Sequence, residues 1–132
     1  PMTRMTLIAA FALSACVATA DETALAPDFS KMDWQLVEVD GKAPGWSATI
    51  NLGEAGRISG QAPCNRYSGP VTRAGDSFVP GMIASTEMAC LHMQGESEFF
   101  ALLAGVTHAE QMPGMLVLKG AGHQMRFVQP ID

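Results

Sequence analysis

From Trp34 onward the chain is a succession of short apolar or alternating runs broken by turn residues, and this pattern limits the fold to short strands. The turns include Asp40-Gly41, a pair that favours a tight hairpin, and a second turn around Gly120 and Gly122. Strands are expected at residues 34–39, 48–52, 57–61, 67–72, 77–79, 82–89, 115–119 and 124–128. Short strands at this spacing are typical of an antiparallel sheet or barrel.

One segment, residues 96–106, departs from this pattern and predicts a helix. Its apolar residues recur at i, i+3, i+4 and i+7: Phe99, Leu102, Leu103 and Val106. Glu96 and Glu98 fall in the first turn, where the helix dipole favours negative charge, and both are expected to be exposed. The apolar stripe is expected to pack on the sheet, with a partner-binding face as the alternative. We therefore predict an α+β fold, mostly antiparallel β, with a barrel-like sheet of about seven to eight short strands and one packed helix.

The first fifteen residues have the features of a secretory signal peptide. A basic start at Arg4 precedes the apolar run 5–13, which is far shorter than the roughly 20 residues of a membrane-spanning helix. The run ends in LSAC at residues 13–16, which resembles the lipobox of bacterial lipoproteins, where the cysteine is acylated. Cys16 is therefore the predicted lipidation site, with ordinary cleavage near residues 18–20 as the alternative. Pro1, which precedes Met2, is interpreted as a cloning remnant.

Residues 16–32 are expected to form the lipidated cysteine and a flexible tether. They are mostly small, polar or acidic and show neither helical nor strand periodicity. Val17 stands where an aspartate often signals inner-membrane retention in lipoproteins that resemble this one. The expected location is therefore the periplasmic face of the bacterial outer membrane, with attachment through the lipid anchor alone.

The chain is acidic, and this excludes several classes of partner. Its formal net charge is −5, and removal of Arg4 with the signal peptide leaves −6. Such a domain repels phosphate backbones and has no basic patch for anionic lipid, so no nucleic acid partner is expected. The remaining residues 33–129 suit a single domain, which is expected to be a monomer.

The three cysteines divide into one lipid attachment site and one pair. With Cys16 assigned to the lipid, Cys64 and Cys90 remain as an even pair in an oxidising compartment, for which a disulfide is the default interpretation. Such a bridge would close a loop of about 27 residues and stabilise the domain by roughly 3–4 kcal/mol in the chain-entropy description.

Catalysis by Cys64 is an alternative role for this cysteine. A nucleophilic thiolate would need a nearby base such as His92, His108 or His123, but no local motif ties a histidine to Cys64. The nucleophile elbow of the α/β-hydrolases is missing from the sequence as well. The chain is therefore expected not to be an enzyme.

Metal binding is an alternative role for Cys90. Met88, Cys90, His92 and Met93 offer soft or borderline ligands that suit copper(I), although only if Cys90 is reduced. The cysteine and histidine spacings that are typical of zinc sites do not occur. Methionine is also a common core residue, so no metal and no cofactor are expected.

Several short motifs together resemble the META domain, the family that includes the HslJ-like heat-shock lipoproteins. The two most specific are CNRYSG at residues 64–69 and ST-x-MAC at residues 85–90. The others are WxL at 34–36, Gly41, Ser59-Gly60, Glu98-Phe99 with Leu103, LVL at 116–118 and MRF at 125–127. Two positions depart from the family pattern, since Pro63 replaces the usual glycine and Glu87 replaces a basic or apolar residue.

The resemblance implies a mostly antiparallel barrel with one helix packed across it, in agreement with the strand pattern. It also supports the pairing of Cys64 with Cys90, because each belongs to one of the two specific motifs. The family has no established catalytic activity to carry over. The implied function is a binding or chaperone-like role in the bacterial envelope, with a link to stress.

The polar residues of the two motifs are expected to have structural roles, in which the asparagine caps a turn, the arginine pairs with an acidic neighbour or stacks on an aromatic ring, and the tyrosine ring is buried. These residues are Asn65, Arg66, Tyr67, Ser85 and Thr86. The alternative is that they form a recognition surface for a peptide or a glycan, and an envelope protein is the protein partner to expect.

A second function hypothesis is a carrier for an apolar small molecule or lipid. Similar domains look like the pilotin lipoproteins of type III secretion, in which a cracked barrel holds an apolar cavity. The methionines together with Phe78, Phe99 and Phe127 would line such a cavity, whereas in the structural alternative they fill the core.

Overall fold

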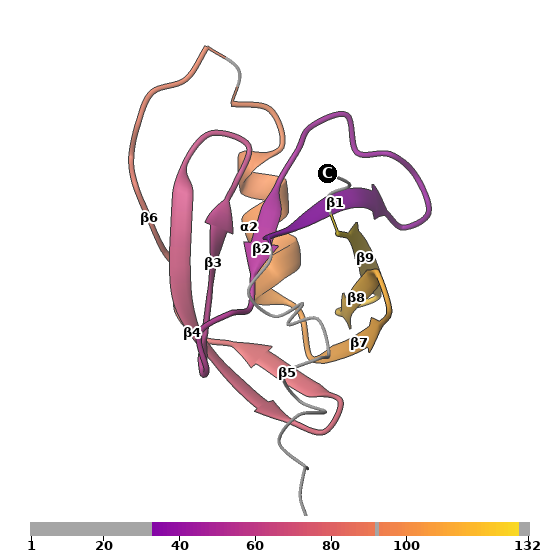
Figure 1. Cartoon of the computed structure of the whole chain (residues 1–132). Helices are drawn as coiled ribbons and strands as arrows, with labels where there is room; N and C mark the ends of the chain where they lie inside the picture. The colour runs from indigo at the N-terminus through magenta and orange to yellow at the C-terminus, as the bar shows by residue number, and fades with distance from the viewer. Residues whose placement is uncertain (1–32, 92, 130–132) are drawn as a thin grey trace, which may run out of the picture.

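The computed structural model describes residues 33–91 and 93–129, and this part of the chain contains nine strands and one helix (Figure 1). The signal peptide, Cys16 and the tether that the sequence predicts lie outside the described residues. The strands are β1 Asp33–Val39, β2 Thr49–Asn51, β3 Arg57–Gln61, β4 Arg66–Ala74, β5 Ser77–Pro80, β6 Ala84–Ser85, β7 His108–Met112, β8 Met115–Gly120 and β9 His123–Val128. The helix, α2, spans Glu96–Ala104.

Eight of these strands close into an antiparallel barrel, which confirms the predicted fold class. The ring runs β1, β2, β3, β4, β5, β7, β8, β9 and back to β1. Two of its junctions consist of one residue pair each, Ser77 with His108 between β5 and β7 and Asn51 with Ser59 between β2 and β3. The ninth strand, β6, lies outside the ring and pairs only with β4 among the described residues.

Strand β4 organises the side of the barrel that carries the two specific motifs. Its first five residues pair with β3 along one edge. Along the other edge it pairs with β6 near its start and with β5 over its second half. Because β4 pairs with β3, β5 and β6, the segment after residue 81 is held against the barrel although it is not part of the ring.

Three details differ from the sequence-based expectation. Strand β7 was not predicted, because only Ala109 of its five residues is buried and the segment lacks an apolar alternation. The strand expected at residues 82–89 is limited to Ala84–Ser85. The helix ends at Ala104 rather than at residue 106, although Val106 is still buried beyond its end.

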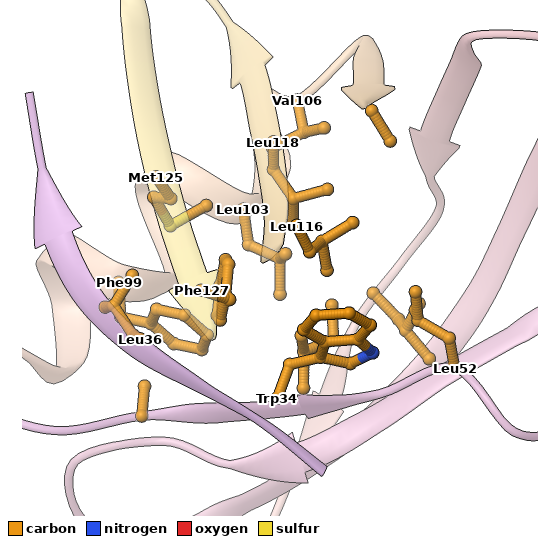
Figure 2. Close-up of a cluster of buried hydrophobic side chains, with 14 of the residues drawn as sticks. Trp34, Leu36, Leu52, Phe99, Leu103, Val106, Leu116, Leu118, Met125 and Phe127 are labelled. Carbon is orange, nitrogen blue, oxygen red and sulfur yellow. The ribbon is translucent and has the colours of Figure 1, made fainter. Parts of the chain in front are cut away.

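The core fills the space inside the barrel. Side chains from alternate positions of β1, β8 and β9 point inward, and Figure 2 shows Trp34, Leu116 and Phe127 turned toward one another. In Figure 1 the helix is seen through the ring of strands, and its Phe99 and Leu103 pack in the same core, so α2 closes one end of the barrel. The position of the helix therefore follows from its apolar stripe, as the sequence predicted.

The start of the helix depends on a close contact between Gly95 and Trp46. Gly95 has a φ of +89°, which favours glycine. A Cβ atom at this position would lie only 2.3 Å from Cγ of Trp46, so the indole ring packs directly on the backbone. Trp46 also meets Phe99 edge to face, with ring centroids 6.1 Å apart. The contact packs Trp46 against the residue that precedes α2.

Candidate functional site: the β4–β6 surface

The two specific motifs lie side by side in the structure. CNRYSG forms a turn and the start of β4, whereas ST-x-MAC forms part of β6 and the segment that follows it. Tyr67 is opposite Ser85 in the antiparallel register. Cys64 and Cys90 form a disulfide with their Cα atoms 6.0 Å apart, which confirms the predicted pairing. The bridge therefore clamps the end of one motif to the start of the other.

The side chain of Asn65 connects three segments of this region. It is 4% exposed, so its amide lies beneath the surface. Its Oδ1 accepts hydrogen bonds from the Thr86 hydroxyl at 2.8 Å and from the Met88 backbone N–H at 2.7 Å. Its Nδ2 donates to Oε2 of Glu96 at 2.7 Å. Asn65 thus joins the turn before β4, the segment after β6 and the first residue of α2.

Glu96 is buried, which corrects the expectation that both acidic residues in the first turn of α2 are exposed. Its Oε1 accepts hydrogen bonds from the backbone N–H groups of Cys64 at 2.8 Å and Asn65 at 3.3 Å. Burial by itself raises its pKa, but the bonds from the Asn65 side chain and these two N–H groups outweigh it and hold the pKa below the ordinary value of 4.5. Glu98, two residues on, is exposed as expected.

Tyr67 is a core residue with a satisfied hydroxyl group. Its hydroxyl donates a hydrogen bond of 2.7 Å to the carbonyl of Thr49. Its ring meets Phe99 and Phe100 edge to face, with centroids 5.4 Å and 5.8 Å away. Burial raises the pKa of Tyr67 well above its ordinary value of 10, so the phenol stays protonated. The ring therefore joins α2 to β4.

The exposed part of the region is a shallow hollow along β4 and β6. It has a volume of about 290 Å³ and is lined by Arg66, Tyr67, Ser68, Ala84, Ser85 and Thr86. We call this the β4–β6 surface. The structure brings together the five residues that the sequence singled out, but the side chains of Asn65 and Tyr67 are buried. Arg66, Ser85 and Thr86 are the three whose side chains are exposed.

A second hollow, which the sequence did not indicate, lies at the opposite turn of the barrel. His123 and Asp40 are 2.7 Å apart through Nδ1 and Oδ2, and the Gln124 N–H donates to Asp40 Oδ1 at 2.9 Å. The histidine and this N–H together hold the pKa of Asp40 below its ordinary value. The hollow measures about 340 Å³, and no serine, threonine or cysteine is among its described lining residues. No side-chain hydroxyl or thiol of these lining residues therefore lies beside the pair.

The copper hypothesis loses one of its ligands in this structure. Cys90 is in the disulfide, so its thiolate cannot bind a metal ion, and His92 lies outside the described residues. Across residues 33–91 and 93–129 no group of three or more histidine, cysteine or acidic side chains is arranged to hold a metal. In the same residues no helix combines the length and the apolar character that crossing a bilayer requires.

The fold and the two joined motifs define a class of protein: a small disulfide-clamped antiparallel barrel closed by one helix. The META domain family model matches residues 27–131, and the chain belongs to this family. A protein from Burkholderia xenovorans solved by NMR has a similar fold, with 23% identity, a TM-score of 0.61, and coverage of 95% of this chain and 100% of that one. A second NMR structure is 22% identical with a TM-score of 0.59, over 86% of this chain and 96% of its own. No curated protein matches the sequence.

Proposed function

We propose that this chain is a non-enzymatic, lipid-anchored envelope protein whose META domain binds an envelope protein through the β4–β6 surface. The anchor rests on the signal peptide of residues 1–15 and on Cys16. A tether over residues 16–32 would hold the domain at the periplasmic face of the outer membrane. The resemblance to the HslJ-like lipoproteins extends the proposal to a chaperone-like role under stress.

The observation that carries the proposal is a set of exposed polar side chains on a base that is already ordered. Arg66, Ser85 and Thr86 line the hollow, and Asn65 and the disulfide hold the backbone beneath them. A surface that is ordered before binding loses little conformational entropy when a partner docks. Rigid polar positions around a hollow therefore suit recognition of another protein.

A role without catalysis agrees with the chemistry of the cysteines and histidines. Cys64, the candidate nucleophile, is oxidised and so has no thiolate to attack a substrate. The described residues around Asp40 and His123 supply no hydroxyl or thiol for that pair to activate. The combination favours binding over a covalent mechanism.

The carrier hypothesis has weaker support, because the phenylalanines that would line a ligand cavity pack in the hydrophobic core. Phe78, Phe99 and Phe127 are each fully buried and belong to the core cluster. Native mass spectrometry of the protein from its own membrane tests this alternative. We expect no small-molecule adduct, and a discrete adduct lost on denaturation would favour the carrier.

Site-specific photo-crosslinking in the intact envelope tests the proposed surface. A crosslinking residue at Thr86 is compared with one at Thr72, which is also exposed but lies farther along β4, about 20 Å from the start of the strand. We expect one discrete protein adduct from position 86 and none from position 72, with loss of the adduct when Arg66 is changed to Glu. Equal crosslinking at the two positions, or none at 86, would contradict the proposal.

A further inference from the structure

Strand β6 leaves a short edge of the sheet without a strand partner among the described residues. The Thr86 N–H donates to the Arg66 carbonyl at 3.0 Å, and Ser85 is opposite Tyr67 in the register. In an antiparallel pair, successive residues direct their backbone groups to opposite sides. The N–H and C=O of Ser85 therefore point away from β4, and Figure 1 shows β6 on the outer side of that strand.

An apolar hollow lies between this free edge and the helix. It has a volume of about 350 Å³ and is lined by Gly81, Met82, Ile83, Ser85, Phe100 and Ala104. Met82 is 88% exposed, and it lines this hollow together with the half-buried ring of Phe100. Ser85 lines both this hollow and the β4–β6 surface. A chain that followed the edge of β6 would thus contact both hollows.

The edge is held in place by contacts on its other side. Asn65 binds Thr86 and Met88 through its side-chain oxygen, and Cys90 is bonded to Cys64. These contacts fix the segment that follows β6 at two points. A peptide that adds to the edge therefore binds to the backbone of β6, which is already extended and fixed, so little conformational entropy of this protein is lost on binding.

The charge beside the edge favours an acidic group on the partner. The ion pairs of the described residues use Arg57, Lys119, His123 and Arg126. Arg66 is exposed, and within residues 33–91 and 93–129 it has no carboxylate within ion-pair distance. Because the whole chain is acidic, this cation gives the β4–β6 surface a local preference for a carboxylate.

We infer that β6 binds an extended peptide segment of a partner protein by strand addition. The peptide pairs its backbone with Ser85, seats a large apolar side chain in the hollow beside Phe100 and places a carboxylate near Arg66. This inference rests on the proposed function and specifies the partner class of the same surface. Edge-strand addition draws its affinity from main-chain hydrogen bonds, and the side-chain hollows supply specificity.

Peptides selected from a random phage-displayed library on the full chain provide the probe. Fluorescence anisotropy then measures the affinity of one selected peptide and of two N-methylated forms, each methylated at alternate backbone amides. Strand addition predicts that one form loses about tenfold or more in affinity and the other less than about threefold, because only alternate amides face Ser85. Equal affinities of the two forms would overturn strand addition.

Two substitutions complete the test without relying on the peptide backbone. Ser85→Pro removes an edge N–H and should abolish binding, whereas Ser85→Ala keeps the backbone and should change the affinity less than about threefold.

Arg66→Gln should lower the affinity for an acidic peptide by about five- to tenfold and leave the affinity for its amide analogue unchanged. Circular dichroism of each variant reports whether it folds. If Ser85→Pro does not fold, the comparison of the two N-methylated peptides still tests strand addition.

Two further outcomes separate this inference from the proposed function. Crosslinking from position 86 that persists while N-methylation has no effect would overturn strand addition and leave the binding surface intact. A dimer of the full chain that sedimentation detects and Ser85→Pro abolishes would identify a second copy as the occupant of the edge and overturn the peptide assignment.

Discussion

The side-chain amide of Asn65 donates a 2.7 Å hydrogen bond to Oε2 of Glu96, 31 residues further along the chain. Both side chains are buried. The bond joins the turn that carries the first motif cysteine to the first residue of α2. The β4–β6 surface is therefore supported from below by one carboxylate that lies at the helix start.

Glu96→Gln is expected to destabilise the domain by roughly 2–3 kcal/mol. Both carboxylate oxygens accept hydrogen bonds, so an amide nitrogen at either position would face a donor. Urea unfolding followed by circular dichroism measures the loss. Glu98→Gln is the matched control, because Glu98 is exposed in the same turn, and its effect should stay within about 0.5 kcal/mol. Equal effects of the two changes would show that the Glu96 contacts are not important for stability.

The stability of the domain is expected to fall in acid. The pKa of Glu96 is lower in the folded chain than its ordinary value of 4.5, so its contribution is complete above that value and is lost as the pH falls through the folded pKa. The pKa values of Glu38 and Asp40 are lowered as well, and their contributions have the same sign. Urea unfolding between about pH 7 and pH 3 should give a steeper decline for the wild type than for Glu96→Gln. Parallel curves would contradict the assignment.

Loss of the disulfide is expected to cost about 3 kcal/mol, because Cys64 and Cys90 close a loop with a sequence separation of 26. A thermal melt of the Cys64→Ala, Cys90→Ala double variant should show a Tm lower by more than about 10 °C. Reductant should lower the Tm of the wild type and leave that of the double variant unchanged. A wild-type Tm that is insensitive both to reductant and to the double substitution would mean that the bridge does not stabilise the fold.

Gly95→Ala is expected to cost more than Gly114→Ala, although both glycines have positive φ. The conformational penalty of about 1 kcal/mol is common to the two changes. Only at Gly95 would the new Cβ meet another group, at 2.3 Å from Cγ of Trp46, whereas nothing lies within 4 Å at Gly114. Overpacking should add about 1–3 kcal/mol at Gly95, measured as the difference in unfolding free energy. Similar costs at the two positions would show that Trp46 moves aside freely.

The strands with strong local signals were predictable from the sequence. Trp34 and Leu36 alternate with less buried neighbours in β1, and Asp40-Gly41 does form the two-residue turn that follows it. The apolar stripe of α2 likewise predicted that Phe99 and Leu103 face the core. In each case the information lies within a few residues of the element, because period and turn chemistry are local properties.

The missed features depend on partners that are distant in sequence. Strand β7 has one buried residue and is defined by its pairing with β8. An acidic residue in the first turn of a helix is usually exposed, so the sequence favoured an exposed Glu96. Its burial is explained by hydrogen bonds from Asn65 and Cys64, which are distant in sequence. Strand β6 is short because β4 begins at Arg66, opposite Thr86, and pairs with β5 from Val71 onward.

Local periodicity, turn residues and the two cysteines thus specified a small β-rich domain with one helix and a disulfide. The closure of the ring, the buried Asn65–Glu96 bond and the free edge of β6 beside Phe100 were decided by tertiary structure. The physical reason is that pairing between strands and burial of polar groups are properties of two segments at once. The sequence of one segment does not identify the second segment with which it pairs.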